Sequence, residues 1–330
     1  MSKPANLRPL QGYNAGYALA VAAPLIWATT SVLIKYLLDL GVPRLALAFW
    51  RDALIALACL AGLLVLRPRA LRVSRHDMRG FALTGAISVG VYHALWVTSI
   101  ALNGAAVATV LIYTFPTFVT IGAWLLFREP IRRPQIAALA LALIGCALVV
   151  RAYDPAVLRV SWVGALVGLS TGMAHAGYVL FSQRAVQSHS PWTSLAYTML
   201  FGALALLAMT LLLAPGELFA MGASAATWLV LIALALGPTL IGYALFTSAL
   251  RHIPGRIASL IAVVEAPAST LLAVLLLGER LEWLQLLGLA LILGAIGLPR
   301  LIGERREART QGRESVIDDR PVISGLPADN

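Results

Sequence analysis

Long apolar stretches with almost no charged residues dominate this sequence and restrict the folds open to it. Ten such windows follow one another, at about 16–36, 45–66, 80–102, 104–127, 134–150, 161–183, 191–213, 224–250, 257–278 and 283–299. A helix that crosses a bilayer needs about 20 predominantly apolar residues, whereas the strands of a membrane barrel are about 10 residues long and alternate in polarity. The windows therefore predict an all-α membrane protein with ten transmembrane helices and no large extramembrane domain.

The composition is also typical of a chain that lies mostly in lipid. Apolar residues make up 60% and charged residues 12% of the sequence, whereas soluble domains are about one quarter charged. The first window has no convincing cleavage site, so we expect a retained helix and not a signal peptide. Cys59 and Cys146 lie inside apolar windows, where thiols usually behave as small buried hydrophobes. We expect no disulfide, no metal site and no cofactor.

The formal net charge of +10 predicts the orientation in the membrane rather than binding to nucleic acid. If the N-terminus lies in the cytoplasm, the inner connections carry 13 Arg and Lys residues before the C-terminal tail, and the outer connections carry five. Cytoplasmic loops of membrane proteins are enriched in these residues. We therefore expect residues 1–14 to be a cytoplasmic segment, residues 303–330 to be a disordered cytoplasmic tail, and the protein to lie in a bacterial inner membrane.

An internal repeat appears when the chain is shifted by 150 residues against itself. The segment "LLFREPIRRPQIAALALALIGCAL" then aligns without a gap to "LLLGERLEWLQLLGLALILGAIGL", and Gln135 falls on Gln285. Residues 15–150 and 160–302 are the two copies, with five helices in each. Because five is odd, the second copy must enter the membrane from the opposite side. Inverted repeats of this kind are typical of secondary transporters, with the substrate site in a central cavity at the repeat interface.

Three segments carry a family resemblance: "FWRDALIA", "ATVLIYTFPTFVTIGAWLLFREPIRRPQIAALALALIGC" and "GYALFTSALRHIPGRIASLIAVVEAPASTLLAVLLLGERLEWLQLLGLALILGA". The sequence resembles the EamA-type members of the drug/metabolite transporter superfamily, and within them the YddG-type amino-acid exporters. The resemblance implies two inverted five-helix halves and export of aromatic and bulky neutral amino acids, and related metabolites, by alternating access. The segment "YHALWVTSIALNGAAV" departs from the commoner pattern of the family.

Glu265 is an ionisable residue that the ninth window places close to the middle of the membrane. It lies about nine residues into the ninth window, which at 1.5 Å per residue is roughly 13 Å from the helix end. Such a residue usually faces a cavity or a partner. It could couple transport to protons or accept a substrate ammonium group. It could equally be protonated and hydrogen-bonded to backbone that Pro267 leaves free.

Four residues are candidates for gating. Pro116 and Pro267 fall at nearly equivalent places in the two copies, where a weakened hydrogen-bond ladder would let a helix bend. Arg51 and Asp52 lie in the outer third of the second window and could close a gate near the external face. Adjacent residues point about 100° apart on a helix, so we expect these two to pair with other groups and not with each other.

Aromatic and polar stripes on two windows predict a binding cavity. Tyr92, Trp96 and Ser99 share one helix face next to His93, and a second window has the same spacing. A cavity lined in this way would accept a large apolar side chain by stacking, although ordinary helix packing explains any single aromatic residue as well. The candidate substrate-binding residues are Tyr92, His93, Trp96, Ser99, Tyr113, His175, Tyr178, Thr239, Tyr243, Phe246 and Glu265.

The absence of other motifs limits the alternatives. The sequence has no P-loop, no nucleophile elbow and no HExxH segment, so we expect neither ATP hydrolysis nor an enzyme. The expected partners are a small-molecule substrate and the bilayer, without nucleic acid, and a monomer is plausible. A multidrug, cationic-compound or purine exporter and a membrane-embedded enzyme remain as alternatives. Coupling stays open between facilitated diffusion and proton antiport.

Overall fold

The computed structural model describes residues 10–155, 161–222, 224–277 and 281–297, and these residues contain helices and turns without strands. The predicted N-terminal segment and C-terminal tail lie largely or wholly outside the described residues. The helices are α1 (Leu10–Trp27), α2 (Thr30–Asp39), α3 (Arg44–Leu66), α4 (Arg75–Gly85), η2 (Ala86–Val91), α5 (Tyr92–Ile112), α6 (Phe115–Phe127), α7 (Arg133–Val149), α8 (Trp162–Ser188), α9 (Pro191–Leu213), α10 (Ala225–Leu234), η4 (Ala235–Thr239), α11 (Leu240–Ala249), α12 (Gly255–Ala262) and α13 (Glu265–Leu277), with short turns η1 (Pro68–Leu71) and η3 (Pro215–Glu217). A further apolar helix spans Trp283–Gly297.

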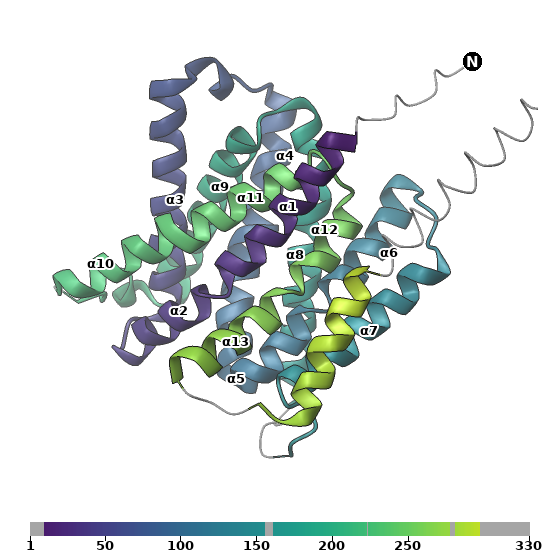
Figure 1. The fold of residues 1–330 in the computed structure, drawn as a ribbon. Coiled ribbons are helices and arrows are strands. Elements are labelled where there is room, and N and C mark those ends of the chain that lie inside the picture. The colour runs from purple at the N-terminus through teal and green to yellow at the C-terminus, as the bar shows by residue number, and fades with distance from the viewer. Residues whose placement is uncertain (1–9, 156–160, 223, 278–280, 298–330) are drawn as a thin grey trace, which may run out of the picture.

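The helices are long and apolar enough to form a membrane bundle. In the described part of the chain, eight helical stretches have the length and composition of membrane spans, and Arg133–Val149 and Trp283–Gly297 are shorter apolar helices. Figure 1 shows them packed side by side, with α2 and α10 on one side and α6 and α7 on the other. The first helix begins at Leu10, earlier than the predicted start near Gly16.

The chain reverses its direction between Asn103 and Val107, where the helical stretches Arg75–Asn103 and Val107–Phe127 meet. Asn103 donates a hydrogen bond to the Gly164 carbonyl oxygen at the beginning of α8. Ser88, before α5, and Thr114, after it, both lie against glycines further along α8. The third and fourth predicted windows therefore run along the same neighbouring helix in opposite directions.

Helices that the repeat relates run antiparallel to each other. In α3 and α9, Trp50 meets Leu218 at one end of the pair, and Leu71 meets Tyr197 at the other. In α7 and the last helix, Gln285 donates to the Val149 carbonyl oxygen, while Gly145 packs further along against the same helix. The two copies are therefore inverted, as the odd number of helices per copy predicts.

A pseudo-two-fold axis passes through the middle of the bundle. The repeat relates α8 to α1 and α5 to α11. A two-fold axis that exchanges the copies therefore requires that α11 contact α1 as α5 contacts α8, and both contacts are present. His93 and Tyr243 are 150 positions apart, which equals the repeat shift, and their side chains approach each other. Two equivalent residues can meet only at the axis. His93 and Tyr243 therefore mark it.

The repeat also extends to helix capping. The Gln135 side chain accepts a hydrogen bond from the Arg132 backbone N–H, and the Gln285 side chain accepts one from the Glu282 N–H, both at 3.0 Å. These glutamines are the pair that the 150-residue shift superimposes. Each satisfies an N–H group that the first turn of a helix leaves free.

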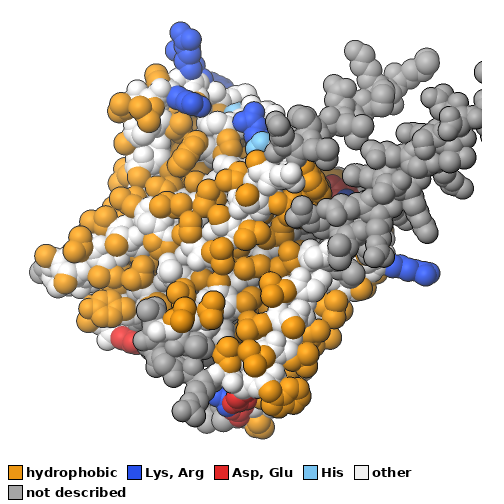
Figure 2. Space-filling view, in the orientation of Figure 1, with side chains coloured by type: hydrophobic (Ala, Val, Ile, Leu, Met, Phe, Trp, Pro, Cys, Tyr) orange, Lys and Arg blue, Asp and Glu red, His pale blue; other side chains and the backbone are white. Residues whose placement is uncertain are grey.

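The two ends of the bundle differ in charge. We call the end that holds the connections after α3, α6, α8 and α11 the basic end, because Arg residues lie in three of these connections and Arg184 lies near the end of α8. In Figure 2 most of the visible Lys and Arg side chains lie at the upper end, and hydrophobic side chains cover the surface below it. At this end Arg256 Nη1 lies 3.1 Å from Glu129 Oε2, which joins the two copies.

A second contact between the copies lies at the opposite end. Tyr153 donates a hydrogen bond of 2.5 Å to Glu282, and Arg151 lies 2.9 Å from the same carboxylate. The hydrogen bond to Glu282 raises the pKa of the Tyr153 phenol. A raised phenol pKa favours this contact below about pH 10 and weakens it only as the pH rises further. The contact should therefore not respond to pH near neutrality.

Candidate functional site

Two helices are broken at equivalent points near the middle of the bundle. The break between α5 and α6 falls at Tyr113 and Thr114, and the break between α12 and α13 falls at Val263 and Val264. The two breaks are 150 positions apart in the sequence, which equals the repeat shift. Because proline has no N–H group, Pro116 and Pro267 weaken the backbone ladder just after each break. Both predicted gating prolines thus lie in the first turn of a half-helix.

A second pair of equivalent irregularities lies in the third and eighth windows. The segments η2 and η4 are π-helical, and they also differ by about the repeat shift. In η4, Pro238 cannot donate to the Leu234 carbonyl oxygen, and the Thr239 hydroxyl donates to that oxygen instead at 2.8 Å. Single π-helical turns are often found at functional sites.

Aromatic and histidine rings meet beside these irregular segments. His175 lies between Tyr92 and Phe115, with ring centroids 4.7 and 4.6 Å away. Tyr243 contacts Tyr178 at 5.3 Å and Trp27 at 5.1 Å. Neighbouring rings at these distances attract one another beyond the area they bury. The aromatic cluster consists of Trp27, Tyr92, His93, Phe115, His175, Tyr178, Tyr243 and Phe246.

A buried chain of polar groups crosses this cluster. Asp52 Oδ2 lies 2.6 Å from His93 Nδ1, and His93 Nε2 lies 3.4 Å from the Tyr243 hydroxyl. Arg51 Nε donates to Asp52 Oδ1 at 3.2 Å. The expectation that Arg51 and Asp52 would not pair is therefore wrong. The arginine side chain is long enough to fold back on its neighbour, and a buried charge without a partner is costly.

Two buried polar atoms in the cluster have no hydrogen-bond partner among the described residues. They are Trp27 Nε1 and His175 Nδ1. The large majority of buried polar side-chain atoms are hydrogen-bonded. Trp27 and His175 thus offer polar atoms to a molecule that enters the cluster.

Tyr113 and Glu265 join the two helix breaks. The Tyr113 hydroxyl and the Glu265 carboxyl group lie within electrostatic range of each other. Glu265 is the first residue of α13 and Tyr113 directly follows α5, so this pair spans the interface of the copies. Glu265 retains some exposed surface, unlike the buried Tyr113.

Three predicted binding residues have other contacts. Ser99 is buried and accepts a hydrogen bond from Asn103, which binds α8. Thr239 satisfies the backbone of its own helix. Trp96 is half-buried and packs at the edge of the core. Spacing on a helix predicts a shared face, but only packing decides what that face contacts.

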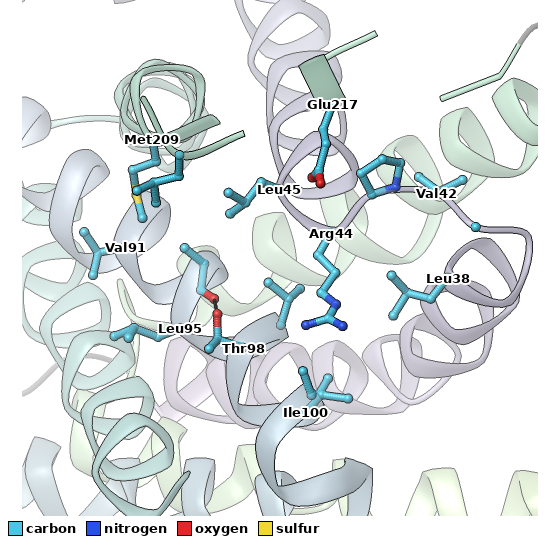
Figure 3. A pocket seen from close by; sticks show the side chains of 16 residues that line it. Leu38, Val42, Arg44, Leu45, Val91, Leu95, Thr98, Ile100, Met209 and Glu217 are labelled. Carbon is cyan, nitrogen blue, oxygen red and sulfur yellow. Dashed lines mark hydrogen bonds between the residues drawn. The ribbon is translucent and has the colours of Figure 1, made fainter. Parts of the chain in front are cut away.

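A cavity of about 740 Å³ lies on the other side of α5, toward the end opposite the basic end. Val91, Leu95 and Met209 form apolar walls, while Arg44 and Glu217 supply charges of opposite sign. Figure 3 shows both charged side chains directed into it. Neither has an ion pair or a side-chain hydrogen bond within the described ranges. None of the predicted candidate residues lines this cavity, so it differs from the predicted central one.

Arg44 and Glu217 belong to no motif or helix stripe that would mark them as binding residues in the sequence. Arg44 follows a proline at the beginning of α3, and Glu217 ends a short turn. Both appear in the sequence as ordinary loop charges at a helix end. Neither the helix period nor the repeat shift relates the two positions in the sequence. Only the tertiary structure brings the beginning of α3 next to the end of α9.

The described residues contain no group of three or more His, Cys, Asp or Glu side chains that could hold a metal ion. The site thus consists of an aromatic cluster, a buried polar chain and an adjacent cavity. Inverted repeats with helices broken at matched positions define the class of secondary transporters. The chain belongs to the EamA-like transporter family, whose model matches residues 14–151 and again residues 162–299.

Relatives in this family are similar along most of the chain. An uncharacterized transporter of Archaeoglobus fulgidus is 28% identical and covers 85% of this chain and 94% of its own. The uncharacterized inner membrane transporter YicL of Salmonella typhimurium is 26% identical, with 88% and 97% covered. A probable terminal-alkyne amino-acid exporter of Streptantibioticus cattleyicolor is 30% identical, with 87% and 94% covered. The named relatives are transporters and not enzymes.

The fold agrees with a solved structure. A crystal structure with 19% sequence identity superimposes with a TM-score of 0.75 and covers 89% of this chain and 99% of its own. At this identity the likeness concerns the fold alone. The protein is therefore a multi-pass membrane transporter with the two-repeat architecture of the drug/metabolite transporter superfamily.

Proposed function

We propose that the protein exports amino acids, with aromatic and bulky neutral ones first, across a bacterial inner membrane by alternating access. The observation that carries the proposal is a cavity with apolar walls and with a cation and an anion that have no partner in the described part of the chain. An amino acid presents a carboxylate to Arg44, an ammonium group to Glu217 and an apolar side chain to the walls near Leu95 and Met209. The relative named as a probable amino-acid exporter supports the same substrate class.

The aromatic cluster is proposed as the deeper part of the same pathway. Val91 and Ala94, which line the cavity, flank His93 in the chain. A bulky side chain that moved inward from the cavity would meet the rings of Tyr92 and Tyr243, and the free polar atoms of Trp27 and His175 would bind its polar end. Because the rings now pack against one another, this binding requires the two copies to move apart.

The ends of the bundle suggest how access alternates. At the basic end, the Arg256–Glu129 contact and the packing of Gly16 against His252 hold the copies together. The cavity lies toward the opposite end. We assign the basic end to the cytoplasm from the distribution of Arg and Lys, so this conformation faces outward. The broken helices near Pro116 and Pro267 are the proposed hinges.

The alternative substrates have weaker support. A cationic drug would use Glu217 or Glu265 but would leave Arg44 without a partner. A phosphorylated substrate would need several Lys or Arg residues in one place, and the described cavity has a single one. A zwitterion uses both charges.

Counterflow in proteoliposomes tests the proposal. Vesicles loaded with an unlabelled amino acid should take up the labelled one, and a panel of amino acids, cationic dyes and purines defines the class. Arg44→Gln and Glu217→Gln should each raise the half-saturating concentration about two- to tenfold, as expected for partly exposed charge contacts. Arg44→Lys, which keeps the charge, is the matched control.

Substrate analogues sharpen the result. An amine that lacks the carboxylate should move equally well in the wild type and in Arg44→Gln, because it never contacts that side chain. The substrate proposal fails if dyes or purines exchange while no amino acid does. The assignment of the cavity fails if amino acids exchange but neither variant alters their half-saturating concentration.

A further inference from the structure

The buried polar chain contains groups that substrate binding does not require. Among the described residues, the buried side chains that can carry a charge near neutral pH are Arg51, Asp52, His93 and His175. Asp52 is 0% and His93 is 3% exposed. Ionisable groups inside a membrane bundle are costly and usually mark ion or substrate pathways.

His93 lies between the two copies, where its ring can bind a proton. A neutral ring with its hydrogen on Nδ1 donates to Asp52 in the first copy and accepts the Tyr243 hydroxyl hydrogen, from the second copy, at Nε2. An imidazolium donates from both nitrogens. One added proton thus reverses the direction of a hydrogen bond that lies on the pseudo-two-fold axis.

Neither His93 nor Asp52 lines the cavity, so the pair reaches water from the end opposite the basic end only when α5 moves relative to its neighbours. The inner walls of the cavity include Val91 and Ala94, on either side of His93 in the chain. Because His93 lies at the axis, it is about equally distant from both ends of the bundle. A change of access that closes one end and opens the other would therefore expose the same ring to the second side.

Other titratable and charged groups face the pair from every neighbouring helix. Arg51 and Asp52 come from α3, His175 and Tyr178 from α8, and Tyr243 from α11. Tyr92, next to His93, lies within electrostatic range of Glu265 at the start of α13. Among these groups, only His93 contacts a carboxylate of its own copy and a hydroxyl of the other.

We propose that the Asp52–His93 pair is the proton-binding site that couples transport to the proton gradient; this inference rests on the proposed export of amino acids. One proton from water binds Nε2 of neutral His93, and the resulting imidazolium keeps its hydrogen bond to the Asp52 carboxylate. After access changes, the same proton leaves Nε2 for water on the other side. Because substrate moves outward and the gradient drives protons inward, the two are exchanged.

Proteoliposomes with an acidic interior test this coupling. In the wild type, protons leaving the vesicles should drive labelled amino acid inward, to at most about tenfold accumulation per pH unit for one-to-one exchange. His93→Gln and Asp52→Asn should lose the accumulation, and the counterflow of each variant without a pH gradient is the rate against which that loss is measured. A pH dye inside neutral vesicles should report proton movement when substrate is added to the wild type and none with either variant.

A histidine variant outside the pathway is the matched control. His189 lies 3.6 Å from Asp77 at the basic end, so His189→Gln removes a histidine–carboxylate pair outside the bundle core. This variant should retain accumulation driven by the pH gradient. If Asp52→Asn does not fold, His93→Gln carries the test alone.

The outcomes separate this inference from the proposed function. Amino-acid counterflow in the wild type that ignores the pH gradient overturns the coupling site and leaves the export proposal standing. If amino-acid accumulation survives in His93→Gln but disappears in Glu265→Gln, the coupling proton binds Glu265, and the proposed Asp52–His93 site is also overturned. A wild type that exchanges no amino acid refutes the proposed function first.

Discussion

At the scale of single residues, the groups that a polar side chain contacts in the folded protein decide its role, and its neighbours in the sequence do not. Asp52 binds both its sequence neighbour Arg51 and the distant His93. Thr239 looks like part of a binding stripe, yet its hydroxyl compensates the backbone bond that Pro238 removes. In both cases the cost of an unsatisfied polar group in an apolar interior selects the partner.

This cost leads to a prediction about stability. Asp52→Leu leaves the Arg51 guanidinium buried without its carboxylate, which should lower the free energy of unfolding by about 3–5 kcal/mol. The double variant Arg51→Met/Asp52→Leu removes both charges and should lose less. Denaturant unfolding in detergent measures both. Equal or greater loss in the double variant would contradict the argument.

At the scale of helices, irregularities occur in matched pairs. The breaks after α5 and α12 are equivalent, and so are η2 and η4. The break between α1 and α2 has no counterpart, because α8 is continuous over 27 residues. Glycines at intervals of four on α8 bring Asn103, Leu111 and Thr114 close to its backbone, because small residues at this spacing let helices approach each other. The continuous helix thus supports the broken one.

A methyl group on α8 tests this support. A Cβ at Gly172 would lie 2.7 Å from the Thr114 hydroxyl and 3.2 Å from the Ile112 carbonyl oxygen, so Gly172→Ala should destabilise the protein. Overpacking of this kind typically costs about 1–3 kcal/mol. Gly62→Ala is the matched control, because nothing lies within 4 Å of its Cβ. Thermal unfolding in detergent should show a lower midpoint for Gly172→Ala alone.

At the scale of the whole molecule, the pseudo-two-fold axis relates the two ends of the bundle. The same packing that closes one end in this conformation is available, by symmetry, to close the other. The contacts of Arg256 with Glu129 and of Tyr153 with Glu282 lie at opposite ends and on the periphery. In the proposed alternating-access cycle, closure shifts from one end to the other around the fixed centre at His93.

The orientation of the whole molecule can be measured by labelling. Gly216→Cys places a thiol at the exposed mouth of the cavity, and Arg72→Cys places one at the basic end. In intact cells, a membrane-impermeant thiol reagent should label Gly216→Cys and spare Arg72→Cys. The natural Cys59 and Cys146 are buried and should not react with the reagent. Labelling of Arg72→Cys alone would reverse the orientation.

Much of the fold could be predicted because its causes are local in sequence. Apolar windows, the repeat and an odd helix count per copy predicted a helical membrane protein with inverted halves. They also placed Tyr92, His93, His175, Tyr178 and Tyr243 near one another. The cavity with Arg44 and Glu217 could not be predicted, because its lining comes from helix ends that only packing brings together.

The sequence by itself determined that this protein lies in the bilayer, that it is helical and that its halves are inverted. Burial in lipid and helix length depend on runs of consecutive residues. Tertiary structure alone decided which charges pair, which hydroxyls serve the backbone and where space remains. The reason is physical: hydrogen bonds and close packing act over a few ångströms, and at that range the partners of a residue are set by the crossing of helices far apart in the chain.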